Sequence, residues 1–250
     1  MHTNYRYMIG SGWWCSGEDA ALSHHKGDAK IRTADFHRLW YEQICNNTNP
    51  SRILIVDSAS PVLPSLNEND ERVHLHRLAT NPGHATNCST QFCGWTAAVL
   101  CGLQDFIHTD NDYFVYVEQD VLLHGKGIIE YAISKMTSPF MFGDAKGIPQ
   151  PLQQSFFIIR KDGAAQFLSK LLGMPESDKE LSPERKFHYA CQSGLLSSSA
   201  LRWVGRKIRK YDFLPFGYGR KRPIDFDAPY YYFQHGTSEE LSVFKKYLKT

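Results

Sequence analysis

The sequence predicts an α/β fold whose mostly parallel sheet is covered by helices on both faces. Predicted strands and helices alternate along the first half in the order β-α-β-(β)-α-β, which is typical of parallel sheets. The strands at 53–56 and 113–117 are continuous apolar runs, as expected when both faces of a strand are buried. Because 250 residues suffice for one sizeable core, we expect a single domain over residues 1–250.

The first predicted strand, 5–9, is followed by Gly10-Ser11-Gly12. These glycines could form a turn that passes close to a ligand or a plain turn from strand to loop. A dinucleotide-binding fingerprint would need a third glycine where Cys15 stands, so that motif is excluded. A helix with apolar groups at helical spacing is predicted over 33–45, before the breaker residues 46–50.

The next strand, 52–56, leaves Asp57 and Ser60 at its carboxyl end. A short strand over 73–78, an Asn-Pro-Gly-His-Ala turn at 81–85 and a small-residue helix over 94–103 follow. In open α/β sheets, ligands bind beyond the carboxyl ends of the strands, so polar groups there are candidate ligand contacts.

The strand at 113–117 stops on Glu118-Gln119-Asp120. Residues i and i+2 of an extended chain point to the same side, so we expect both carboxylates to face one ligand. Such oxygen groups suit a hard divalent cation with a phosphate on its far side. The alternative is a strand end with two solvated acids.

In the second half, strands are predicted at 140–143 and 154–160, and Asp162 is expected to cap a helix that Gly173 ends. Ser182-Pro183-Glu184 has the composition of another helix start. A basic segment and the aromatic run 230–233 then precede His235. The basic residues of the segment are Arg202, Arg206, Lys207, Arg209, Lys210, Arg220, Lys221 and Arg222.

Charge and hydropathy restrict the function classes. A formal net charge of +2 gives no global electrostatic case for nucleic acid, so no nucleic-acid partner is expected. No apolar run is long enough to span a membrane, the first residues do not resemble a signal peptide, and the six cysteines form no CxxC pair. We therefore expect a cytoplasmic protein, with segment 202–222 as a candidate for peripheral contact with a membrane.

Taken together, a strand ending in Asp57, the Asn-Pro-Gly-His-Ala turn, the small-residue helix and a strand ending in acid-x-acid resemble a known family. They resemble nucleotide-sugar-dependent glycosyltransferases of the GT-A fold, over roughly residues 50–190. The resemblance implies a Rossmann-like nucleotide-binding half at 1–120. It also implies an acceptor-binding half with the C-terminal basic segment at 121–250.

The same resemblance implies roles for individual residues. Asp57 would contact the nucleotide base or ribose, with Gly10 and Ser60 as further donor contacts. Glu118 would lie near the ribose or the metal shell, while Asp120 would bind Mn²⁺ or Mg²⁺ and His235 would complete the metal shell. Glu118-Gln119-Asp120 departs from the Asp-x-Asp pattern of the family in its first residue and carries Gln in the middle.

Glu184 matches the acid that begins an acceptor-side helix in inverting members and serves as general base, with Asp178 and Glu180 as rivals. The implied enzyme is a metal-dependent hexosyl- or pentosyltransferase. It moves sugar from a UDP- or GDP-sugar to a hydroxyl of a glycan or lipid-linked acceptor. A cation of the basic segment would neutralise the diphosphate, and the sequence does not distinguish which.

Three alternatives stay open at this point. One is a retaining transferase of the same fold, and another is a non-catalytic module that binds sugar nucleotides. The third is a sugar-1-phosphate nucleotidyltransferase, although Trp13-Trp14 stand where that class needs small residues.

Overall fold

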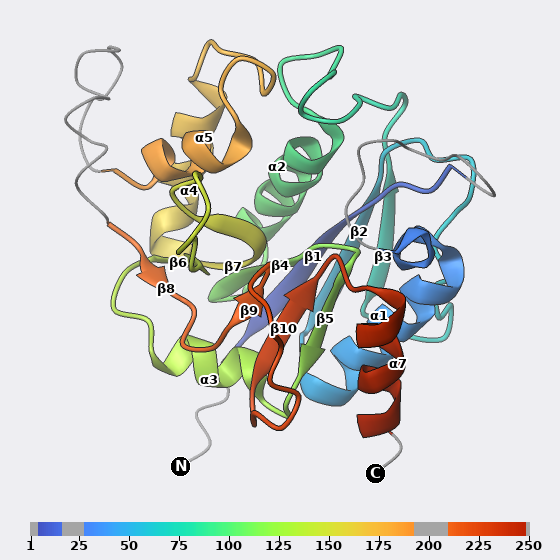
Figure 1. Cartoon of the computed structure of the whole chain (residues 1–250). Coiled ribbons are helices and arrows are strands. Elements are labelled where there is room, and N and C mark those ends of the chain that lie inside the picture. The colour runs from blue at the N-terminus through green and yellow to red at the C-terminus, as the bar shows by residue number, and fades with distance from the viewer. Residues whose placement is uncertain (1–4, 17–27, 193–209, 249–250) are drawn as a thin grey trace.

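The computed structural model describes residues 5–16, 28–192 and 210–248 and shows an α/β protein (Figure 1). Its main sheet has seven strands in the order β3-β2-β1-β4-β7-β6-β8. The strands are β1 (Tyr7–Trp13), β2 (Arg52–Asp57), β3 (Val73–Arg77), β4 (Tyr113–Val117), β6 (Phe140–Gly143), β7 (Gln153–Arg160) and β8 (Asp212–Phe213).

Most neighbouring strands of this sheet run parallel. β1 pairs parallel with β2 and β4, and β2 pairs parallel with β3. β7 is antiparallel to both β4 and β6, while β8 is again parallel to β6. The predicted fold class, a mixed and mostly parallel sheet flanked by helices, is confirmed. The carboxyl ends of β1, β2 and β4 therefore lie along one edge of the sheet.

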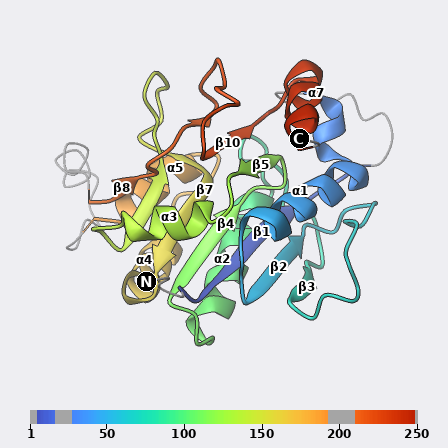
Figure 2. The same cartoon turned by 90° about the horizontal axis from the view of Figure 1, so that it is seen from below.

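Helices cover both faces of the main sheet, as Figures 1 and 2 show. One face packs against α2 (Gly94–Ile107), α4 (Lys161–Leu172) and α5 (Pro183–Ala190) through a core rich in phenylalanine. The other face packs against α1 (Ala34–Asn47) and α3 (Ile128–Ser134). The short 3-10 helix η1 (Ala29–Arg32) precedes α1, whose N-cap Thr33 accepts a hydrogen bond from the Phe36 amide.

A second, three-stranded sheet lies in front of the main sheet in Figure 1 and was not predicted. β5 (Val121–His124) leaves the end of β4 and pairs antiparallel with β10 (Tyr231–Gln234), which also pairs with β9 (Tyr218–Gly219). The outer face of this sheet packs against α7 (Ser238–Tyr247) and Phe36 of α1. The second sheet thus brings the C-terminal part of the chain to the carboxyl end of β4.

Two local predictions are wrong. The first strand does not end in a glycine turn, because β1 continues through Gly10 to Trp13. A Cβ atom at Gly10 would lie 2.8 Å from the Phe114 ring, so the glycine makes room for a core side chain. Asp162 does not cap α4 either: Arg160 is the N-cap, and Asp162 in the first turn binds the Arg160 guanidinium.

No helix in the part of the chain that the structure describes is long and apolar enough to cross a membrane. Residues 202–209 of the predicted basic segment lie outside the described residues.

Candidate active site

The sequence predicted that the carboxylate motif after β4 is extended, but the structure shows a turn at residues 119–120. The Val121 amide donates to the Glu118 carbonyl at 3.0 Å, which closes the turn. The Gln119 side chain accepts from the Trp14 amide at 2.7 Å and donates to the Trp14 carbonyl at 3.1 Å. Gln119 therefore fastens the motif to the end of β1, and the chain reverses into β5.

Asp120 and His235 meet because β5 and β10 pair in one register. Gln234 faces Val121 in this antiparallel pair, so the next residues along each chain, His235 and Asp120, are neighbours. His235 Nε2 lies 3.5 Å from Asp120 Oδ2. His235 has a left-handed φ of 55°, an uncommon conformation for a non-glycine residue that occurs often at functional sites.

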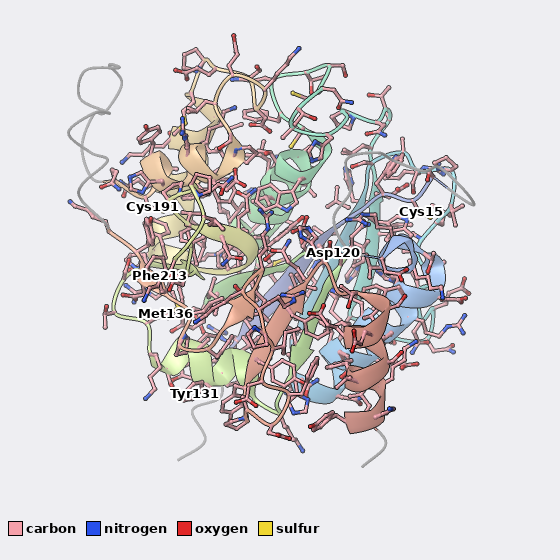
Figure 3. All side chains as sticks on the ribbon, in the orientation of Figure 1. Cys15, Asp120, Tyr131, Met136, Cys191 and Phe213 are labelled. Atoms are coloured by element: carbon pink, nitrogen blue, oxygen red, sulfur yellow. The ribbon has the colours of Figure 1, made fainter. Side chains whose placement is uncertain are left out.

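Asp120 is buried and has capacity to bind a cation. Its side chain is 5% exposed, and its Oδ1 is buried without a hydrogen-bond partner in the described structure. An orphaned buried carboxylate oxygen is costly unless a ligand satisfies it. Figure 3 places Asp120 near the centre of the view, at the upper end of the small sheet.

Asp120 and His235 could provide two ligands of a metal ion whose other ligands are phosphate oxygens and water. Within the described ranges, no group of three or more His, Cys, Asp or Glu side chains is arranged to hold a metal by itself. Mg²⁺-type ions commonly take only one or two carboxylates and complete their shell with substrate phosphates and water. The side-chain amide nitrogen of Gln234 lies 3.1 Å from His235 Nε2. A metal ion bound to His235 Nε2 would replace this contact.

Two arginines that the sequence did not single out act on the carboxylates. Arg32, the last residue of η1, has its guanidinium 3.6 Å from Asp120 Oδ2. Arg220 follows β9, and its positive charge acts on the titration of both Glu118 and Asp120. No motif surrounds Arg32, and Arg220 was one of eight basic residues in its segment.

Burial dominates the electrostatics of the acids. Desolvation raises the pKa of Glu118 to about 8, and the nearby Asp120 carboxylate adds to the rise. Desolvation likewise raises the pKa of Asp120 to about 6. Arg32 and Arg220 oppose both shifts. The carboxylates therefore share one electrostatic environment, in which additional positive charge is favourable.

Glu184 is the third acid of this region. It lies in the first turn of α5, which begins with Pro183 after the N-cap Ser182. Its charge contributes to the raised pKa of Glu118, which means that the two carboxylates lie within electrostatic range. No hydrogen bond or ion pair with another described residue engages the Glu184 carboxylate.

The two rival acids are engaged in structural contacts. Asp178 Oδ1 lies 2.8 Å from Lys186 Nζ, with both side chains fully buried, and Asp178 Oδ2 accepts from the Cys93 amide at 2.8 Å. Glu180 is exposed, and its Oε2 accepts from the amide and hydroxyl of Ser177 at 2.8 and 2.9 Å. Among the three acids, Glu184 is the one whose carboxylate makes no hydrogen bond or ion pair with another described residue.

Asp57 and Ser60 lie at the same edge, at the end of β2, but they bind each other. Asp57 Oδ1 accepts from the Ser60 amide at 3.0 Å and lies 2.5 Å from Ser60 Oγ. Asp57 Oδ2 lies 3.2 Å from the Nε of Arg77. The side chains of Asp57 and Ser60 are fully buried, and their contacts hold the loop after β2. Contact of these residues with a nucleotide stays a prediction. Gly10 lies within β1 against Phe114, away from the strand end.

By sequence, no protein-family model and no curated protein matches the chain. By structure, it is similar to the mannosyltransferase PcManGT from Pyrobaculum calidifontis in complex with GDP-Man and Mn²⁺. The TM-score is 0.51 at 11% identity, over 93% of this chain and 58% of that one.

Two further structures are similar at lower scores. HddC from Yersinia pseudotuberculosis has a TM-score of 0.47 at 12% identity, over 98% of this chain and 99% of that one. TarS from S. aureus has 0.48 at 10% identity, over 97% and 39%. The likeness to PcManGT concerns the fold alone, and we conclude that this chain shares the α/β fold of that structure over the 58% of it that is covered.

Proposed function

We propose that the chain is a metal-dependent glycosyltransferase of the GT-A type that uses a nucleoside-diphosphate sugar. The observation that carries the proposal is the meeting of Asp120 and His235 at the carboxyl end of β4, with Asp120 Oδ1 buried and unpartnered. Open α/β sheets bind nucleotides at this edge, and the fold is shared with a mannosyltransferase solved with GDP-Man and Mn²⁺.

Asp120 and His235 would hold Mn²⁺ or Mg²⁺, with Glu118 beside the ion or the ribose. The ion would bind the diphosphate and neutralise the negative charge that the leaving group gains. Asp57 and Ser60 would support the nucleoside from the end of β2, through the backbone of the loop that they hold. We leave Gly10 out of the site, because its position against Phe114 accounts for the glycine.

Glu184 would act as general base in an inverting transfer. Its carboxylate takes the proton from the acceptor hydroxyl as the hydroxyl oxygen attacks the anomeric carbon. The bond from that carbon to the diphosphate oxygen breaks on the opposite side, and the nucleoside diphosphate leaves with the bonding electrons. The acceptor is a hydroxyl of a glycan or lipid-linked glycan. If NMR of the product showed retention at the anomeric carbon, this role of Glu184 would be excluded.

Calorimetry tests the donor and metal parts of the proposal. UDP and GDP are titrated into the protein with Mn²⁺ and with EDTA, and one of them is expected to bind more tightly with Mn²⁺. Asp120→Asn removes the negative charge that binds the cation and should abolish the Mn²⁺-dependent part. Asp110→Asn is the matched control, because Asp110 is exposed and lies just before β4, at the opposite end of that strand.

Two results would contradict the proposal. One is the absence of binding of both nucleotides to the wild-type protein under either condition. The other is Mn²⁺-dependent binding by Asp120→Asn equal to that of Asp110→Asn, which would remove Asp120 as a metal ligand.

A further inference from the structure

We propose that Trp95 and Ser155 bind hydroxyl groups of a sugar ring beside Glu184. The inference rests on the proposed function and adds to it two residues that the family resemblance leaves without a role. Two buried polar groups without partners carry it, the indole nitrogen of Trp95 and the hydroxyl oxygen of Ser155. Both lie at the edge of the main sheet where the carboxylate motif begins.

Ser155 lies next to the carboxylate motif, on the face of the main sheet that α2 and α5 cover. Its carbonyl accepts from the Glu118 amide at 2.8 Å, which extends the β4–β7 ladder by one step beyond the pair of Val117 and Phe156. Because side chains alternate along a strand, Ser155 points to the same side as Phe157, whose ring belongs to the core under α2, α4 and α5. Ser155 is 2% exposed, and its Oγ has no hydrogen-bond partner among the described residues.

Trp95 covers the same end of this face from the first turn of α2. The centre of its ring lies 5.2 Å from that of Tyr116 in β4 and 6.3 Å from that of Phe157 in β7. Phe114, the preceding residue of β4 on this face, instead packs against Gly102, so the start of α2 lies towards the carboxyl end of β4. Trp95 is half-buried, and its Nε1 is buried without a hydrogen-bond partner among the described residues.

Glu184 borders the same place. It precedes Phe187 by three residues in α5, and residues at this spacing are neighbours on one side of a helix. The ring centre of Phe187 lies 5.2 Å from that of Trp95. The loop before α5 is also tied to the start of α2, because Asp178 Oδ2 accepts from the Cys93 amide at 2.8 Å. The first turn of α5, with Glu184, therefore lies against the first turn of α2, with Trp95.

The three polar groups suit an uncharged ring that carries hydroxyl groups. An indole N–H only donates, a serine hydroxyl donates and accepts, and an ionised carboxylate only accepts. A sugar hydroxyl satisfies each of them, because it can both donate and accept. The aromatic rings around Trp95 offer apolar surface to the C–H groups of such a ring. A phosphate fits poorly here, because the Glu184 carboxylate would repel it.

Two substrates of the proposed reaction supply such a ring, the donor and the acceptor. Ser155 adjoins the motif at which the donor is proposed to bind, and Trp95 adjoins the proposed base. If the ring belongs to the donor, the two side chains affect the affinity for a sugar nucleotide and not that for the bare nucleotide. If the ring belongs to the acceptor, they affect binding of a glycoside to the complex of protein and nucleotide.

The experiment uses Trp95→Phe, which keeps an aromatic ring, and Ser155→Ala, which removes only the hydroxyl. Calorimetry at saturating Mn²⁺ compares UDP and GDP with UDP-glucose, UDP-galactose and GDP-mannose. Saturation-transfer NMR, with Mg²⁺ and nucleotide present, measures binding of the methyl glycosides of glucose, galactose and mannose. Each variant should weaken one of these two classes of sugar ligand by about 3-fold to 10-fold, the usual effect of one neutral hydrogen bond. Affinity for UDP and GDP should change by less than about 2-fold.

Two controls match these changes. Trp40→Phe removes the indole N–H of a buried tryptophan on the opposite face of the main sheet, and Ser169→Ala removes an exposed hydroxyl of α4. Both should bind every ligand like the wild type. Thermal melting is the second readout. Because Trp95→Phe and Ser155→Ala remove groups that make no hydrogen bond within the described protein, their melting temperatures should stay within about 2 °C of the wild type or rise.

The inference fails for either residue whose variant binds the sugar nucleotides and the methyl glycosides like its control. It also fails if a variant loses bare nucleotides and sugar ligands alike, and a lower melting temperature would then assign that residue a structural role. If the wild-type protein binds neither UDP nor GDP, the proposed function fails together with this inference. Normal binding of nucleotide by the wild type, with both variants like their controls, overturns the inference alone.

Discussion

Lys186→Met should strongly destabilise the protein, because Lys186 and Asp178 form an ion pair inside the core. Both side chains are fully buried, with Nζ and Oδ1 2.8 Å apart, and Lys186 also lies 5.0 Å from the centre of the Phe92 ring. Asp178 Oδ2 accepts from the amide of Cys93, the N-cap of α2. The pair thus connects α5 and the loop before it to the start of α2.

The size of the effect follows from the burial. Removing one partner of a fully buried pair leaves the other charge without compensation and costs about 3–5 kcal/mol of unfolding free energy. For a chain of this length, that corresponds to a fall in melting temperature of roughly 6–20 °C. The double variant Asp178→Asn/Lys186→Met removes both charges, so it should lose much less than the sum of the single variants.

Guanidinium denaturation of the two single variants, the double variant and Lys179→Met gives these free energies. Lys179 is exposed in the same loop, so its variant should differ from the wild type by less than about 0.5 kcal/mol. A Lys186→Met protein as stable as the wild type would refute the reasoning. If Asp178→Asn kept full stability but lost turnover, Asp178 and not Glu184 would be the base.

Two further predictions concern pH and the carboxylate motif. Burial lowers the pKa of His37 to about 4 from an ordinary 6.5, so the folded protein binds this proton less readily than the unfolded chain. The stabilisation from neutral His37 is therefore present above pH 6.5 and is lost as the pH falls towards 4, by up to about 3 kcal/mol. In denaturation measurements across this range, the unfolding free energy of His37→Gln should fall less steeply with decreasing pH than that of the wild type. An identical fall in both proteins would exclude His37 as the cause. Gln119→Ala removes both bonds to the Trp14 backbone and should cost about 1–3 kcal/mol in the same assay, whereas an unchanged midpoint would show that these bonds do not hold the turn.

Much of the main sheet could be predicted because its signals are local. The apolar runs that end at Asp57 and at Glu118 identify β2 and β4, and the proline after Ser182 marks the start of α5. The predicted first strand ended too early, because the length of β1 depends on packing with distant residues. Gly10 and Gly12 look like a turn in the sequence, but their missing side chains make room for Phe114 and for the Tyr116 hydroxyl.

The second sheet could not be predicted, because it depends on pairing between residues about a hundred positions apart in the chain. The pairing of Val121 with Gln234 brings His235 next to Asp120. No local sequence pattern predicts this pairing. The resemblance to a family supplied His235 instead. Arg32 was missed for the same reason, since only the fold brings η1 to the motif after β4.

The measurement that tests the site most directly is nucleoside diphosphate release by Glu184→Gln, from a panel of UDP- and GDP-sugars with Mn²⁺ and candidate acceptors. Removal of the base should lower turnover by about 100-fold to 10,000-fold, while calorimetric affinity for the donor nucleotide changes by less than about 2-fold. The control is Glu180→Gln, which changes an exposed acid in the loop before α5 and should retain the wild-type rate. Near-normal turnover by Glu184→Gln, or equal losses in both variants, would contradict the assignment of Glu184 as the general base of a glycosyltransferase.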